Sequence, residues 1–219
     1  ASGLVALAAV IRRGSAEEVP DEHGSASFTT AMLMRGTGRR SCQQMSFELE
    51  SLGAMTGCSD GADACSLSLR CTRQVAFEAT SLLTEALRMP AFEPAQHEIQ
   101  RQETLAELRM QEDDKFGFTY REYLKMMFHG HGYGHPSQGE REDVLRMTPQ
   151  DCQRWQGRAI RPENPMVVVA GDMNTLEWRG VLEGLLGDFD GPGENLTRCE
   201  QPARAATGQT LELTRPELQ

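Results

Sequence analysis

The sequence predicts an α+β fold in which helices cover a mixed, mostly antiparallel sheet. Segments with strand-like and helix-like apolar spacing follow one another in the order strand, helix, helix, hairpin, several helices, strand, helix and strand. Helices therefore separate strands that must pair over long sequence distances, which is typical of helices packed on one sheet. The chain of 219 residues is long enough for one large buried core, so we expect a single domain over residues 1–219.

The first half of the chain contains clear local signals for each element. Residues 4–11 form an apolar run that predicts a buried strand. Residues 24–34 have helical spacing. The next predicted helix begins at Ser41, with Gln44 three residues later as in a capping box, and ends at Gly53.

A β-hairpin and further helices are predicted after that point. Residues 54–72 alternate on both sides of a Ser-Asp-Gly turn, as in a hairpin. Further segments with helical spacing are 74–88, 94–112, 116–128, a short helix that starts at Thr148, and 176–186. Strands are expected at 166–170 and 210–214, whereas 191–207 shows no convincing periodicity.

Composition and charge exclude several classes of partner. Hydrophobic residues make up 39% and charged residues 25%, as in ordinary globular proteins. The longest apolar runs are far too short to span a bilayer. The formal charge of −10 argues against nucleic acid, which requires clustered lysine and arginine. We therefore expect a soluble protein, cytoplasmic or periplasmic, with neither nucleic acid nor membrane as a partner.

The cysteine residues and the histidine residues each allow two interpretations. The six cysteines form no C-x-x-C pair, so they are small buried hydrophobes, or Cys58 and Cys65 form a disulfide across the hairpin. His129, His131 and His135 lie in a glycine-rich stretch, either as a solvated loop or as a metal site. One G-x-S-x-G string occurs, GCSDG at residues 57–61, but it lies in the predicted hairpin turn and not between a strand and a helix, as a nucleophile elbow requires. The chain contains no phosphate-binding glycine loop.

The stretch 24–37, which reads GSASFTTAMLMRGT, resembles the zinc-binding segment of the pitrilysin/insulinase peptidases, family M16. Five further blocks resemble this family in the same order: ELESLGA, LTEALRMPAF, EIQRQETLAEL, HGYGHPSQGERE with LRMTPQDCQRW, and RPENPMVVVAGDM. The resemblance implies the LuxS/MPP-like metallohydrolase fold. It also implies that this chain is the first lobe of a longer protein, with a second lobe after residue 219.

The zinc motif of that family is degenerate in this chain. In the family, H-x-x-E-H supplies two zinc ligands and the general base. The resemblance places Ser27 and Ala31 at the two histidine positions and Thr30 at the glutamate position. It places the third ligand at Glu107, which is retained, and Gln100 where an acidic residue is usual. We therefore expect a non-catalytic lobe with no zinc of its own.

The resemblance also implies partners. The family builds peptide chambers from paired lobes or subunits, so we expect a zinc-bearing homologous lobe or subunit and an extended peptide. The peptide is expected at the first strand of the hairpin, at Thr56, Gly57 and Cys58, by strand addition. The alternatives are a plain sheet strand without a ligand at these residues, and a scaffold protein of the same fold that has no peptidase partner.

Overall fold

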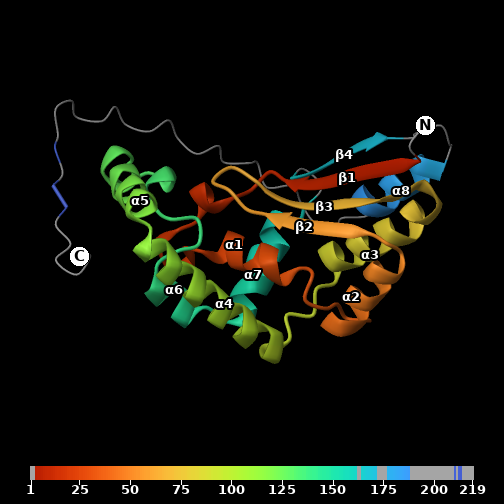
Figure 1. The fold of residues 1–219 in the computed structure, drawn as a ribbon, viewed down its shortest axis with the longest axis horizontal. Coiled ribbons are helices and arrows are strands. Elements are labelled where there is room, and N and C mark those ends of the chain that lie inside the picture. The colour runs from red at the N-terminus through yellow and green to blue at the C-terminus, as the bar shows by residue number, and fades with distance from the viewer. Residues whose placement is uncertain (1–2, 162–163, 172–176, 188–209, 211, 214–219) are drawn as a thin grey trace.

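The computed structural model describes residues 3–161, 164–171, 177–187, 210 and 212–213. A four-stranded sheet of order β2-β3-β1-β4 forms one layer, and each described pair of neighbouring strands is antiparallel (Figure 1). The strands are β1 (Leu4–Ile11), β2 (Met55–Ser59), β3 (Cys65–Thr72) and β4 (Pro165–Gly171). The predicted α+β class and mostly antiparallel sheet are thus confirmed.

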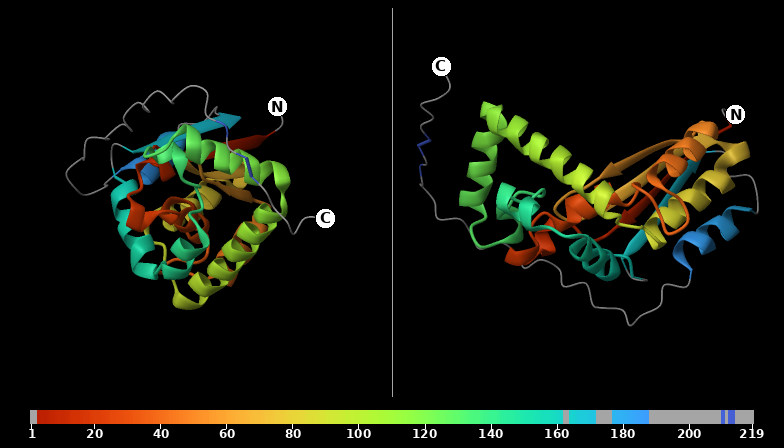
Figure 2. Two further views of the ribbon diagram at one scale, coloured as in Figure 1. Left: turned by 90° about the vertical axis from the view of Figure 1, so that its left-hand side faces the viewer. Right: turned by 90° about the horizontal axis from the view of Figure 1, so that it is seen from below.

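Helices gather on one side of this sheet, and α5 lies at one end of the molecule (Figures 1 and 2). The helices are α1 (Ser25–Met32), α2 (Cys42–Ser51), α3 (Ala76–Arg88), α4 (Pro94–Asp113), α5 (Lys115–Met127), α6 (Arg141–Arg146), α7 (Pro149–Ala159) and α8 (Glu177–Leu186). Short 3-10 turns are η1 (Ser15–Glu17), η2 (Pro20–Glu22), η3 (Arg73–Val75) and η4 (Gly132–Gly134).

Strand alternation determines which face of the sheet is buried. In β1, Val5, Leu7, Ala9 and Ile11 point into the core, because successive strand residues face opposite sides. Their register partners in β3 are also buried, namely Cys71, Leu69, Leu67 and Cys65. Helix α3, which the helical spacing at 74–88 predicted, covers this face with an apolar stripe. The stripe consists of Ala76, Ala79, Leu82, Leu83, Ala86 and Leu87, all of which are buried.

One helix was not predicted, and one expected strand does not form in the residues that the structure describes. The acidic segment around residue 140 contains helix α6, whose six residues are too few to show a periodic pattern. Its start is recognisable from Asp143, which accepts a hydrogen bond from the Glu140 N–H at 2.9 Å. The three described residues of the expected strand 210–214 do not form a strand, and the segment 191–207 lies outside the described residues.

The disulfide alternative fails for Cys58 and Cys65. Register places Cys58 opposite Leu67, and both cysteines are free, as are the other three in the described residues. Cys65, Cys71 and Cys152 are buried as small hydrophobes. Within the described part of the chain, no helix combines the length and apolar character that crossing a bilayer requires.

Candidate functional site

Helix α1 begins at a glycine and is capped from a distance. Gly24 has a φ of 85°, a conformation that favours glycine. The Glu18 carboxyl group accepts hydrogen bonds from the N–H groups of Gly24 at 2.8 Å and Ala26 at 2.6 Å. A Cβ atom at Gly24 would lie 2.5 Å from the Gln138 carbonyl oxygen, so the loop before α6 packs tightly on the start of α1.

The three degenerate positions lie on α1 as the spacing predicted. Ser27 and Ala31 are half-buried and one turn apart, so they share a face of the helix. Thr30 is 1% exposed. Burial raises the pKa of the nearby Cys65 thiol to about 11, and this thiol donates to the Ala26 carbonyl oxygen at 3.9 Å. A buried hydroxyl beside a neutral thiol cannot serve as a general base at neutral pH.

Helix α4 supplies the opposite side of the site. Glu107 is exposed and accepts a hydrogen bond from the Gln138 Nε2 at 2.9 Å. Gln100 is 6% exposed and accepts from the Arg35 Nε at 2.8 Å, and Arg35 also forms an ion pair with Glu103. An arginine just beyond α1 therefore connects this helix to α4.

These residues do not fit a zinc ion. Catalytic zinc requires three protein ligands with nitrogen, sulfur or carboxylate donors, and Glu107 is the single such donor among the degenerate and retained positions. In the described ranges, no three histidine, cysteine, aspartate or glutamate side chains are placed to hold a metal ion. Ser27, Thr30 and Ala31 supply neither an imidazole nor a carboxylate, so at these four positions the ligand set of a catalytic zinc is incomplete.

The histidine loop is held by ring and hydrogen-bond contacts, and in the part of the chain that the structure describes it forms no group of three metal-ligating side chains. His131 Nδ1 accepts from the Tyr133 N–H at 3.1 Å, so in its neutral form this ring carries its proton on Nε2. His135 stacks on His23 with ring centroids 4.0 Å apart. Burial, together with His135, lowers the pKa of His23. The stacked rings of His23 and His135 hold the loop beside the start of α1.

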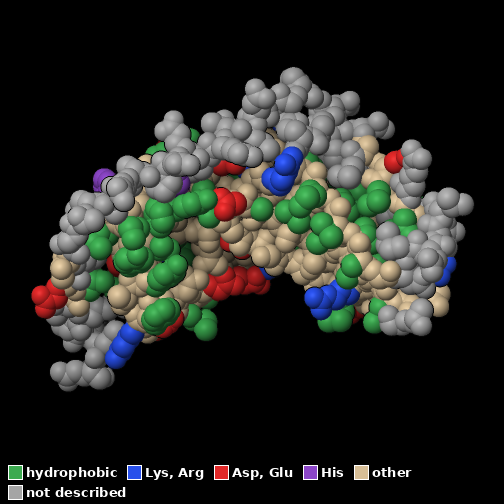
Figure 3. All heavy atoms as spheres, turned by 90° about the horizontal axis from the view of Figure 1, so that it is seen from above, with side chains coloured by type: hydrophobic (Ala, Val, Ile, Leu, Met, Phe, Trp, Pro, Cys, Tyr) green, Lys and Arg blue, Asp and Glu red, His purple; other side chains and the backbone are tan. Residues whose placement is uncertain are grey.

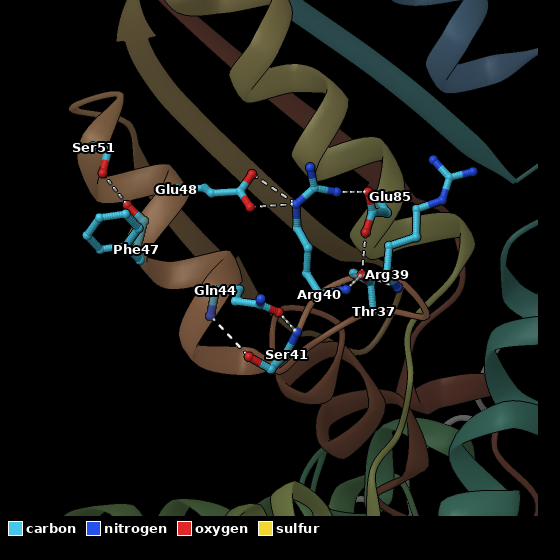
Figure 4. A network of polar contacts seen from close by, with 9 residues as sticks. All are labelled: Thr37, Arg39, Arg40, Ser41, Gln44, Phe47, Glu48, Ser51 and Glu85. Carbon is cyan, nitrogen blue, oxygen red and sulfur yellow. Dashed lines mark hydrogen bonds and ion pairs between the residues drawn. The ribbon is translucent and has the colours of Figure 1, made fainter.

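The Arg-Gly-Thr turn after α1 is held by a buried glutamate (Figure 4). Thr37 donates its hydroxyl proton to Glu85, which is 7% exposed, and accepts from the N–H groups of Arg39 at 3.2 Å and Arg40 at 3.0 Å. The Arg40 guanidinium pairs with both Glu85 and Glu48. This network places the turn between α1 and α2 against α3.

Strand β2 offers an exposed sheet edge. Among the described strands it pairs with β3 alone, and it packs beside α1. Thr56 and Cys58 are exposed and Gly57 is half-buried. The unpaired edge of a strand presents N–H and C=O groups that an extended chain can pair with. The three residues predicted for peptide contact thus lie next to the helix that carries Ser27.

Two contacts at this site, Glu18 with the start of α1 and Gln138 with Glu107, could not be predicted from a local sequence motif. Glu18 lies in an acidic loop before the helix that it caps, and Gln138 lies 31 residues from Glu107. Neither residue belongs to a capping or ligand motif with a fixed spacing. Packing of the loops on α1 and α4 brings them to the site.

The protonation of Glu18 predicts how stability changes with pH. Burial raises the pKa of Glu18 to about 8, although the Ala26 and Gly24 N–H groups act in the opposite direction. Between the ordinary glutamate pKa of 4.5 and this raised value, the folded state therefore binds more protons than the unfolded state. The free energy of unfolding should fall as the pH rises, by about 2 kcal/mol after allowance for partial solvent exposure.

Urea unfolding at about pH 5.5 and about pH 8, within and at the end of this titration window, measures the effect. Glu18→Gln should show a flatter dependence on pH than the natural chain, whereas Glu50→Gln, at an exposed position on α2, should not. Equal slopes for the natural chain and Glu18→Gln would show that this carboxyl group does not titrate in the window.

Comparisons with known proteins agree with this geometry. The sequence profile of the family described as Insulinase (Peptidase family M16) matches residues 2–138. An uncharacterized zinc protease of Rickettsia bellii is 22% identical over 78% of this chain and 41% of its own length. One of Bacillus subtilis is 20% identical over 90% of this chain and 48% of its own.

A solved structure shows the same fold. The crystal structure described as a peptidase M16 inactive domain, from Pseudomonas fluorescens, superposes with a TM-score of 0.85 at 23% identity. The match covers 92% of this chain and 49% of that one. The chain thus spans about half the length of the relatives that it matches.

Proposed function

Since this chain belongs to the insulinase family, peptidase family M16, and has Ser27, Thr30 and Ala31 at the positions of the motif, we propose that it is a non-catalytic peptide-binding lobe. It would act together with a zinc-bearing homologous lobe or subunit and would help to hold extended peptides. The observation that carries this proposal is chemical: a hydroxymethyl and a methyl group stand where two imidazoles would bind the metal, and a hydroxyl replaces the base.

The retained geometry supports peptide binding rather than cleavage. The β2 edge at Thr56, Gly57 and Cys58 remains open beside α1, although α1 carries no reactive group. Strand addition requires main-chain groups alone, so it survives the loss of the metal ligands. The Pseudomonas fluorescens structure, described as an inactive domain of this family, is consistent with such a division of roles.

Binding of fluorescent decapeptides to the isolated chain tests this proposal. The chain should bind an extended peptide without cleaving it, with or without a chelator. Two peptides are compared, N-methylated at the odd or at the even residues. Methylation in the frame whose N–H groups face β2 should weaken binding about tenfold, because two or three main-chain hydrogen bonds of roughly 0.5–1.5 kcal/mol are lost. N-methylation in the other frame should have little effect, because those N–H groups point away from β2.

Three outcomes would count against this proposal. Cleavage that a chelator abolishes would refute the non-catalytic assignment. Equal loss in both frames would show that the peptide does not bind as a strand. Absence of any peptide binding, with an intact fold by circular dichroism, would favour the alternative of a scaffold without a peptidase partner.

A further inference from the structure

Helix α5 carries an apolar face that the described structure leaves exposed. Phe116, Tyr120, Tyr123 and Met127 form what we call the aromatic stripe. They are spaced four, three and four residues apart, so they lie on one face of the helix. Phe116 is 79%, Tyr120 52% and Tyr123 42% exposed, and α5 has no buried residue. An amphipathic helix without a buried residue indicates a missing partner surface.

The rings of the aromatic stripe are ordered relative to one another. The ring centroids of Phe116 and Tyr120 lie 6.2 Å apart with an interplanar angle of 3°, and those of Tyr120 and Tyr123 lie 6.3 Å apart. From Phe116 to Met127 the row is about 16 Å long, at the rise of an α-helix. A row of this length on one helix face matches the side of another helix.

Charged groups of α5 lie on its other faces. Lys125 pairs with Glu122 and with Glu140, which directly precedes α6. Arg121 lies over the Phe118 ring, 5.6 Å from its centroid. The aromatic stripe itself contains no charged side chain. Its composition of tyrosine, phenylalanine and methionine is that of the centre of a protein interface.

The aromatic stripe is also well placed for a large partner. Figures 1 and 2 place α5 at the end of the molecule remote from α3 and α8, and Figure 3 shows apolar side chains at this end as well as farther along the molecule. With about 150–250 Å² per aromatic side chain, the exposed rings contribute roughly 300–400 Å². This area suits the centre of an interface that buries about 800 Å² per partner.

We propose that the aromatic stripe is the docking surface for a second M16 lobe, which packs one of its helices along α5. This inference rests on the proposed function and adds the surface through which the partner binds. The relatives are about twice as long as this chain, so a similar length of polypeptide accompanies the matching half in each of them. An extended peptide would instead use the main-chain groups of the β2 edge.

Matched surface variants test this docking surface. The test pair is Phe116→Ser with Tyr120→Ser. The control pair is Phe47→Ser with Phe77→Ser, which removes rings that are 71% and 64% exposed on α2 and α3. The binding probe is a zinc-bearing M16 lobe from the same source, encoded beside this chain or on the same polypeptide. Calorimetry gives Kd, circular dichroism checks folding, and sedimentation gives the oligomeric state.

The test pair should weaken binding of the zinc-bearing lobe at least about tenfold, because aromatic anchors dominate interface energies. The control pair should leave Kd unchanged, and both should bind the decapeptide as the natural chain does. If the natural chain binds the zinc-bearing lobe but the test pair binds it equally well, this inference alone is wrong. Self-association that only the test pair abolishes would identify a second copy as the occupant and overturn the inference. If the natural chain does not bind the zinc-bearing lobe, the pairing in the proposed function is wrong as well.

Discussion

The double variant Ser27→His with Ala31→His is expected to bind one zinc ion per chain, whereas the natural chain is expected to bind none. Imidazoles four residues apart share one face of a helix, which is the spacing that zinc helices use. Ser27 and Ala31 are half-buried on α1, so larger side chains have access to solvent and to α4. Glu107, exposed and hydrogen-bonded to Gln138, would complete a set of three ligands.

Metal content after dialysis against zinc measures this result, and thermal unfolding with and without a chelator provides a second readout. Zinc at roughly 1,000 times its Kd should stabilise the double variant by about 4 kcal/mol. The matched control is the same double variant with Glu107→Ala, which should bind zinc at least about tenfold more weakly. Equal zinc affinity in the two variants would show that Glu107 does not face Ser27 and Ala31 in the required way.

Addition of Thr30→Glu to this double variant should affect the stability of the protein as well as restore the general base. Thr30 is 1% exposed beside Cys65, so a carboxylate there lacks solvent and must be stabilised by the metal or its water. We expect the triple variant to be less stable than the double variant without zinc and to recover with zinc. A glutamate at position 30 would thus be costly without zinc, which explains why a threonine occupies this position in a chain that lacks the metal ligands.

Glu85→Ala is expected to lower the free energy of unfolding by about 2–3 kcal/mol, because the buried Thr37 hydroxyl loses its acceptor and the partly exposed Arg40 keeps Glu48 as its one carboxylate partner. Glu85 holds both the Thr37 hydroxyl and the Arg40 guanidinium (Figure 4). Its loss frees the turn that follows α1. Thr37→Val removes the hydroxyl that donates to Glu85 and accepts from the Arg39 and Arg40 N–H groups, and it should cost about 2–3 kcal/mol.

Urea unfolding at constant pH measures these changes. Glu78→Ala provides the matched control, since Glu78 lies on the same helix but is exposed, and it should change stability by less than about 0.5 kcal/mol. A loss below about 1 kcal/mol for Glu85→Ala would show that Arg40 is satisfied by Glu48 alone and that the network does not hold the turn.

Much of the fold follows from local patterns. The capping box of Ser41 and Gln44, the alternation of the hairpin and the apolar stripe of α3 all occur in the structure where the sequence places them. These signals depend on neighbours within a few residues, so they can be recognised in the sequence without knowledge of the tertiary fold. Helix α6 was missed because a helix of six residues carries too little periodicity to detect.

The helix that contains the aromatic stripe shows the opposite case. Apolar spacing predicted a helix at 116–128, and the structure contains α5 at Lys115–Met127. The same spacing would normally indicate a face turned to the core. The structure instead leaves Phe116 and Tyr120 exposed, because the sheet and the other helices do not reach that face. Periodicity identifies an apolar face but not what covers it.

The sequence by itself determined most of the elements between β1 and β4, apart from α6, because these depend on residue type and short spacing. The resemblance of the same residues to the M16 family placed Ser27, Thr30 and Ala31 at the positions of the zinc motif. Only the tertiary structure decided that Glu18 caps α1 and that Arg35 reaches α4. Arg35 and Gln100 are separated by 65 residues, and no local pattern encodes their meeting. Such contacts form when the packing of whole elements selects one arrangement, which is why they became visible only in the folded chain.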